Sequence, residues 1–198
     1  MLANRVGWIR QHPAGTYTEK WLGPSLPAPA RAGTCDIDND GDLDVFFADG
    51  DGFSTAGTQR QNTLYINQIV GTGTAYSFTD ESVARLGVNL SNAKGVVTAD
   101  IDGDGWIDAL YTNAFLTDPP FLYHNRGAVQ PGFFDQQAAA RGLTASYSSG
   151  NAQFGDLLDD HLGERLKGAR DDQSFLLVHG VLDQHFVWQV FQLFRFFD

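Results

Sequence analysis

Residues 36–44 read Asp-Ile-Asp-Asn-Asp-Gly-Asp-Leu-Asp, and residues 100–108 read Asp-Ile-Asp-Gly-Asp-Gly-Trp-Ile-Asp. Both stretches fit the pattern D-x-D-x-D-G-x-x-D without a gap. A loop with four or five carboxylates repels itself and needs a cation to be stable. The pattern therefore predicts two cation sites. The alternative is a pair of Asp- and Gly-rich turns that bind nothing, and two gapless matches in one chain argue against it.

The spacing of the acidic residues indicates which cation these loops bind. Alternate residues of a tight loop converge, and glycine at position 6 permits a sharp reversal. Positions 1, 3, 5 and 9 offer carboxylates, and position 7 offers a backbone carbonyl. Such an all-oxygen shell suits Ca²⁺ better than Mg²⁺. The expected ligands are Asp36, Asp38, Asp40, Asp42 (through its carbonyl) and Asp44 in the first loop, and Asp100, Asp102, Asp104, Trp106 (through its carbonyl) and Asp108 in the second.

An EF-hand is the first alternative for such a loop, and the sequence excludes it. An EF-hand needs a bidentate glutamate at loop position 12 and a helix on each side. Position 12 is Phe47 in the first loop and Tyr111 in the second. Residues 43–48 and 106–111 are rich in aromatic and β-branched side chains, which predicts buried strands.

The two loops lie within a longer repeat. The first is followed by N-T-L-Y-I-N at residues 62–67, and the second by F-L-Y-H-N at residues 121–125. The pattern F-x-D-x₆-G then occupies residues 78–87 and again residues 133–142, which aligns Phe78 with Phe133. Each unit has about four short strands, which is typical of a β-propeller blade.

This order of motifs resembles the FG-GAP/VCBS repeats, the blades of integrin α-subunit-like β-propellers. The resemblance covers roughly residues 30–156, and the aspartate loops are its specific part. It implies a calcium ion in the hairpin between the first two strands of each blade. It also implies an extracellular or cell-surface setting and a recognition or adhesion role toward a protein or carbohydrate ligand. The alternative is an accessory domain of, or a fragment from, a secreted polysaccharide-acting enzyme.

We therefore expect an all-β chain, a β-propeller-type repeat array of about three blades. Residues 31–94 are the expected first repeat and residues 95–148 the second. Residues 1–30 are expected to end a preceding blade or to form an N-terminal arm. Residues 149–198 are expected to be a degenerate or truncated third repeat. Their loop, residues 156–164, lacks an acid at position 3 and has histidine where glycine is needed, so the sequence leaves its metal binding open.

The end of the chain raises the question of how the array closes. Residues 161–198 match nothing in the repeat, and residues 186–197 are apolar with neither a strand nor a helix period. Closed propellers have about four to eight blades, so this chain alone is not expected to close a ring. A fragment, an oligomer and an open array remain the alternatives. Exposed strand edges and the apolar tail are candidate surfaces for self-association.

The composition limits the classes of function. The chain has 198 residues and a net charge of −11, with 21 Asp and only 3 Glu, and nine of the Asp lie in the two loops. An acidic surface repels phosphate backbones, so nucleic acid is not an expected partner. No apolar stretch of about 18 residues predicts a membrane span. Residues 1–10 show no apolar core of a signal peptide.

No catalytic constellation is visible in the sequence, so no enzyme activity is predicted. The five histidines share no close spacing, and no G-x-S-x-G, HExxH or phosphate-binding glycine loop occurs. The single cysteine, Cys35, is expected to be a buried and inert thiol. His124 is expected to be a surface residue at the end of a strand.

Overall fold

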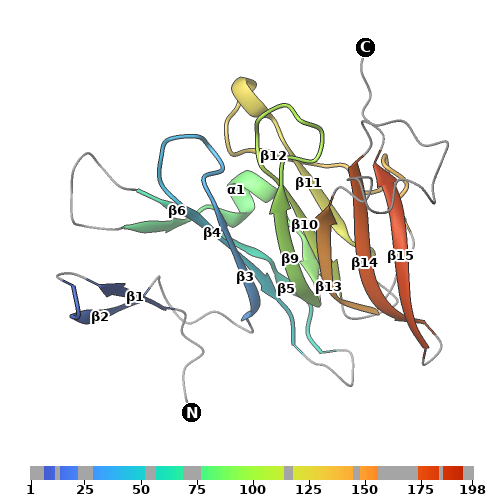
Figure 1. Cartoon of the computed structure of the whole chain (residues 1–198), viewed down its shortest axis with the longest axis horizontal. Helices are drawn as coiled ribbons and strands as arrows, with labels where there is room; N and C mark the ends of the chain where they lie inside the picture. Colours follow the sequence, from blue (N-terminus) through green and yellow to red (C-terminus); the bar gives the residue numbers. More distant parts are fainter. Residues whose placement is uncertain are drawn as a thin grey trace.

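The computed structural model of the chain describes residues 7–11, 14–21, 29–51, 57–68, 77–113, 118–144, 148–155, 174–182 and 185–193. Within these ranges the chain is almost entirely β-sheet (Figure 1), as the sequence predicts. The predicted third loop, residues 156–164, lies outside them. No helix in the described ranges has the length and apolarity needed to cross a membrane.

The first aspartate loop belongs to a four-stranded antiparallel sheet in the order β3-β4-β6-β7. Its strands are β3 Pro29–Cys35, β4 Asp44–Asp49, β6 Thr63–Asn67 and β7 Phe78–Asp80. Each strand pairs with the next one along the sheet, and the aspartate loop connects β3 to β4. Strands β4 and β6 are wholly buried, as expected for their apolar and aromatic composition.

The second aspartate loop belongs to a sheet of the same design, in the order β9-β10-β11-β12. Its strands are β9 Ala93–Ala99, β10 Asp108–Asn113, β11 Phe121–Asn125 and β12 Phe134–Gln136. The pairing Ala109↔Tyr123 repeats the pairing Val45↔Tyr65 of the first sheet. The two sheets are therefore equivalent strand for strand, and strands rather than helices flank both loops.

The register of the fourth strands corrects the sequence alignment by one residue. Phe78 lies opposite Asn67, and Phe134 lies opposite Asn125, so the structural equivalent of Phe78 is Phe134 rather than Phe133. The sequence offered two adjacent phenylalanines for this position. The structure buries Phe134 in the core and leaves Phe133 half-buried.

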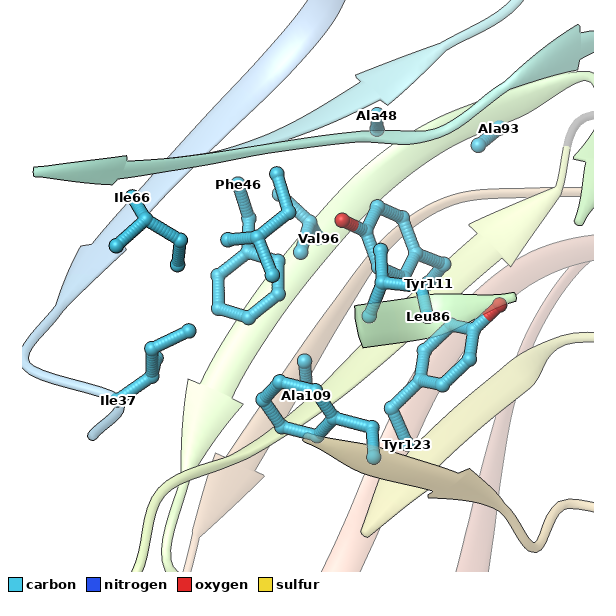
Figure 2. Packing of buried hydrophobic residues seen from close by; sticks show 12 residues of the cluster. Ile37, Phe46, Ala48, Ile66, Leu86, Ala93, Val96, Ala109, Tyr111 and Tyr123 are labelled. Atoms are coloured by element: carbon cyan, nitrogen blue, oxygen red, sulfur yellow. The ribbon is translucent and has the colours of Figure 1, made fainter. Parts of the chain in front are cut away.

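The main hydrophobic core lies between the two sheets. Figure 2 shows side chains of both sheets pointing toward one another, with Leu86 of α1 among them. The ring of Phe46 lies edge-on to Tyr111 at 6.2 Å and to Phe134 at 5.8 Å between centroids. Strand β9 also lies against β3 and β4. The two repeats therefore share the main core, and each also has a smaller hydrophobic cluster of its own.

The N-terminal hairpin and the C-terminal sheet lie on opposite sides of these two sheets in Figure 1. A third sheet, in the order β13-β14-β15, places β13 against β9. Near the N-terminus, strands β1 and β2 pair as an antiparallel hairpin. Most of the apolar stretch without a clear period forms strand β15. The elements are β1 Gly7–Gln11, β2 Tyr17–Trp21, β5 Arg60–Gln61, α1 Ser82–Leu86, β8 Leu90–Ser91, the 3-10 turn Gly127–Val129, β13 Ser148–Gly155, β14 Ser174–Leu182 and β15 His185–Leu193.

Candidate metal centres

The two aspartate loops lie at the same end of their sheets, the upper end in Figure 1. Both reverse direction through left-handed residues at positions 4 and 6. These are Asn39 (φ 57°) and Gly41 (φ 96°) in the first loop, and Gly103 (φ 76°) and Gly105 (φ 89°) in the second. Asparagine tolerates this conformation better than most residues with a side chain. The loop sequence therefore dictates the turn that gathers its carboxylates.

Position 1 of each loop holds the turn together. The carboxylate of Asp36 accepts hydrogen bonds from the backbone N–H groups of positions 5 and 6, at 3.1 and 3.0 Å. Asp100 accepts the same two bonds at 3.2 and 3.0 Å. Position 5 likewise accepts from the N–H of position 7, which is Asp42 in the first loop (3.1 Å) and Trp106 in the second (2.9 Å). These bonds give both loops the same converged shape.

Position 9 anchors each loop to its own sheet. Asp44 and Asp108 are buried, and each accepts one hydrogen bond from the N–H of position 2 at 3.2 Å. The second carboxylate oxygen accepts from the N–H of Asn67 (2.8 Å) or Asn125 (2.7 Å). These two asparagines end the Leu-Tyr strands, which explains why that motif follows each loop.

Position 3 carries the feature that points most directly to a cation. One carboxylate oxygen of Asp38, and the same oxygen of Asp102, is buried and has no hydrogen-bond partner among the described residues. A buried carboxylate oxygen without a partner is costly. A hard cation is the partner that an oxygen in an acidic loop lacks. The residues present therefore fit a bound Ca²⁺.

The expected ligands gather in part. Carboxylate oxygens of Asp36, Asp38 and Asp40 lie within 4.8 Å of one another in the first loop, and so do those of Asp100, Asp102 and Asp108 in the second. Two expected carboxylates are not in these sets. Asp44 faces its backbone donors at the base of the first loop. In the second loop, Asp104 gathers with Asp102 and the ring of His124 instead.

Burial shifts the acidity of these groups. It raises the pKa of Asp44 to about 7 and that of Asp108 to about 6. The backbone hydrogen bonds that these carboxylates accept lower both pKa values, but burial has the larger effect. It also raises the pKa of Asp38, and the neighbouring Asp40 carboxylate adds to the rise. Burial therefore disfavours the charged form of these carboxylates, and a nearby positive charge favours it.

Three residues in contact with the loops were not foreseen from the sequence. His124, expected at the surface, is half-buried, and its Nε2 lies 2.7 Å from Asp102 Oδ2. Arg85 lies 3.3 Å from Asp38, and Arg141 lies 3.5 Å from Asp102. All three place a nitrogen beside the carboxylate at position 3 of a loop.

The equivalence of the two arginines depends on the register of the fourth strand. When Phe78 is aligned with Phe133, as the sequence pattern suggests, Arg85 matches an alanine. When Phe78 is aligned with Phe134, as the strand pairing requires, Arg85 matches Arg141. An alignment of the two repeats in the correct register would therefore have shown that Arg85 and Arg141 are equivalent.

The single cysteine agrees with the sequence expectation of an inert thiol. Cys35 is half-buried and packs against the main core. Burial raises its pKa to about 12, so the thiol stays protonated at neutral pH.

A buried carboxylate outside the loops predicts a pH dependence of stability. Asp49 is fully buried, and it accepts a hydrogen bond from Thr63 Oγ1 at 2.7 Å. Burial raises its pKa from 3.8 to about 6. The carboxyl group of Asp49 therefore binds its proton more tightly in the folded state than in the unfolded chain. This difference stabilises the folded state fully below about pH 4, and the stabilisation is lost as the pH rises to about 6.

Replacing Asp49 with asparagine is expected to remove that loss. Denaturant titrations from pH 4 to 7 measure the free energy of unfolding of both proteins. The value for Asp49→Asn should rise relative to the wild-type value as the pH rises, by roughly 1–3 kcal/mol at pH 7. Asp135→Asn, at an exposed position, is the matched control. Parallel profiles for Asp49→Asn and the wild type would contradict the prediction.

The comparison with known families agrees with this geometry. The sequence model of the family described as "FG-GAP-like repeat" matches residues 36–111, a span that contains both aspartate loops. No curated protein matches the chain. With the two equivalent four-stranded sheets, the match makes the fold a partial β-propeller-type repeat array. Residues 36–111 of the chain are therefore similar to the FG-GAP-like repeat family.

Proposed function

We propose that this chain is a calcium-binding, non-catalytic repeat protein that takes one Ca²⁺ in each aspartate loop. The observation that carries the proposal is the buried carboxylate oxygen at position 3 of both loops, which has no hydrogen-bond partner in the part of the chain that the structure describes. A bound calcium ion supplies positive charge and links carboxylates that otherwise repel one another. The proposed ligands are the loop residues expected from the sequence, from Asp36 to Asp44 and from Asp100 to Asp108.

The protein's own residues prepare the loops for this ion. The carboxylate at position 1 orders the backbone turn, and the one at position 9 fixes the base of the loop on the third strand of the sheet. Calcium then makes the hairpin rigid, and the surfaces next to it keep one shape. A rigid array of loops suits recognition better than catalysis, and the FG-GAP-like repeat is a non-catalytic family.

We infer that the protein acts as an extracellular recognition or adhesion scaffold for a protein or carbohydrate ligand. The family resemblance supports this setting. Extracellular calcium modules bind with a Kd of about 10⁻⁴–10⁻³ M, which matches loops that are open to solvent. At calcium tenfold above Kd, each site adds about 1.4 kcal/mol to the stability of the folded state.

A calorimetric titration of chelator-stripped protein tests the calcium sites. Two sites per chain are expected, and the first loop should bind more tightly because it has five carboxylates against four. Asp40→Ala and Asp104→Ala remove exposed carboxylates at position 5. Each should abolish or strongly weaken one site without lowering the stability in chelator.

Asp135→Ala is the control, since it removes an exposed acid outside the loops and should leave both sites unchanged. No binding heat from the wild type would overturn the calcium proposal. Binding that persists unchanged in the Asp40→Ala and Asp104→Ala double variant would also overturn it.

A further inference from the structure

An arginine contacts the third aspartate of each loop, and it comes from the same place in both repeats. Arg85 lies in α1, just after the fourth strand of the first sheet. Arg141 lies in the turn after the fourth strand of the second. Counted from the equivalent phenylalanines Phe78 and Phe134, the two arginines occupy the same position. Neither arginine belongs to the aspartate pattern itself.

The two arginines are held in the same way. The Nε of Arg85 donates to Glu81 Oε2 at 2.6 Å, and the Nε of Arg141 donates to Gln137 Oε1 at 2.9 Å. A terminal nitrogen of Arg85 lies 3.3 Å from Asp38 Oδ2, and a terminal nitrogen of Arg141 lies 3.5 Å from Asp102 Oδ2. In both loops the other oxygen, Oδ1, is buried and has no hydrogen-bond partner among the described residues. The arginine thus lies beside Oδ2, which in the second loop also contacts His124 Nε2 at 2.7 Å, and Oδ1 is left for an ion.

Both guanidinium groups are sheltered from water, which makes their charge effective. The side chains of Arg85 and Arg141 are only 10% and 17% exposed. Exposed ion pairs contribute little because water and salt screen them. A sheltered cation beside several carboxylates is screened much less, and it offsets part of their mutual repulsion when no metal is bound.

The second repeat packs over Arg85 and keeps it in place. The guanidinium group of Arg85 lies 4.9 Å from the centroid of the Phe133 ring, and its Nη1 donates a long hydrogen bond to the carbonyl oxygen of Pro131 at 3.4 Å. A Cβ at Gly132 would lie 2.2 Å from Nη1 and 3.0 Å from the Cβ of Asp38, and the left-handed backbone there (φ 70°) favours glycine. The cation at the first loop is therefore positioned by the neighbouring blade.

We propose that Arg85 and Arg141 are built-in counter-ions of the calcium loops. Each keeps its loop folded in the absence of calcium and, because it stands beside the ion's site, lowers that loop's affinity for calcium. This inference rests on the proposed calcium function of the loops. It gives each arginine two opposite effects, which a residue needed only for packing does not have.

The test compares charge-removing with charge-keeping variants. In Arg85→Gln and Arg141→Gln, the calorimetric Kd for Ca²⁺ at the affected loop is expected to fall about tenfold, because a unit charge no longer opposes a divalent ion. The melting temperature in chelator should fall, and saturating calcium should restore most of it. Arg85→Lys and Arg141→Lys keep the unit charge, so their Kd should stay closer to the wild-type value than that of the glutamine variants.

Arg60→Gln is the matched control, since it removes the same charge from an ion pair with Asp51, which follows the far end of β4. It should leave the calcium Kd unchanged. A Kd that rises or stays constant in both glutamine variants would overturn the counter-ion role. If Arg85→Gln does not fold with or without calcium, Arg141→Gln decides.

The wild-type titration separates this inference from the function on which it rests. No calcium binding by the wild type would overturn both. Two calcium sites in the wild type, together with glutamine variants that lose stability equally in chelator and in calcium, would overturn the counter-ion role alone.

Discussion

Replacing Phe46 with alanine is expected to lower the free energy of unfolding by about 3–5 kcal/mol and to destabilise both repeats together. The Phe46 side chain is fully buried, and its ring contacts Tyr111 and Phe134 of the second sheet. Its loss would leave a cavity at the boundary of the two sheets. Domains of this size are typically stable by only about 5–15 kcal/mol, so the variant would lose a large fraction of its stability.

Urea titrations followed by far-UV and near-UV circular dichroism measure this effect. A single transition at a lower midpoint is expected, since both repeats contribute to the main core. Val129→Ala is the control, because Val129 is 92% exposed and its truncation should change stability by no more than about 0.5 kcal/mol. Two separate transitions in Phe46→Ala would mean that each repeat folds on a core of its own.

The parts of the fold that the sequence predicts are those with local signals. The aspartate loops, their glycine turns and the strands that follow them depend on residues that lie close together along the chain. The Leu-Tyr motif is also local, and its terminal asparagine binds the loop through Asn67 in one repeat and Asn125 in the other. The repetition of these signals was enough to predict an all-β array of equivalent units.

The remaining features depend on contacts between distant segments. Two adjacent phenylalanines left the register of the fourth strand open by one residue, and only pairing with β11 and burial of Phe134 decide it. That one-residue shift concealed the equivalence of Arg85 and Arg141. His124 was placed at the surface because the sequence does not show that its strand end faces Asp102.

Replacing Asp108 with alanine is expected to have the largest effect at the candidate site, and the effect should depend on calcium. Asp108 is buried and accepts backbone hydrogen bonds from Ile101 (3.2 Å) and Asn125 (2.7 Å). The variant leaves both donors unpaired. In chelator, the variant also removes a carboxylate whose charged form is disfavoured by burial, as its raised pKa indicates, and this gain offsets part of the cost. The free energy of unfolding is therefore expected to fall by about 1–3 kcal/mol.

If Asp108 binds the ion as proposed, the offset disappears in saturating calcium, because the wild-type carboxylate is then paired with Ca²⁺. The expected loss grows to about 3–5 kcal/mol, the range found when one partner of a buried charge pair is removed. Denaturant titrations in chelator and in calcium measure both values. Asp104→Ala separates the two contributions, since among the described residues the exposed Asp104 carboxylate accepts one hydrogen bond, from the N–H of Trp106, and its loss should cost stability mainly with calcium. Equal losses for Asp108→Ala in the two conditions would mean that Asp108 holds the loop to β11 but does not bind the ion.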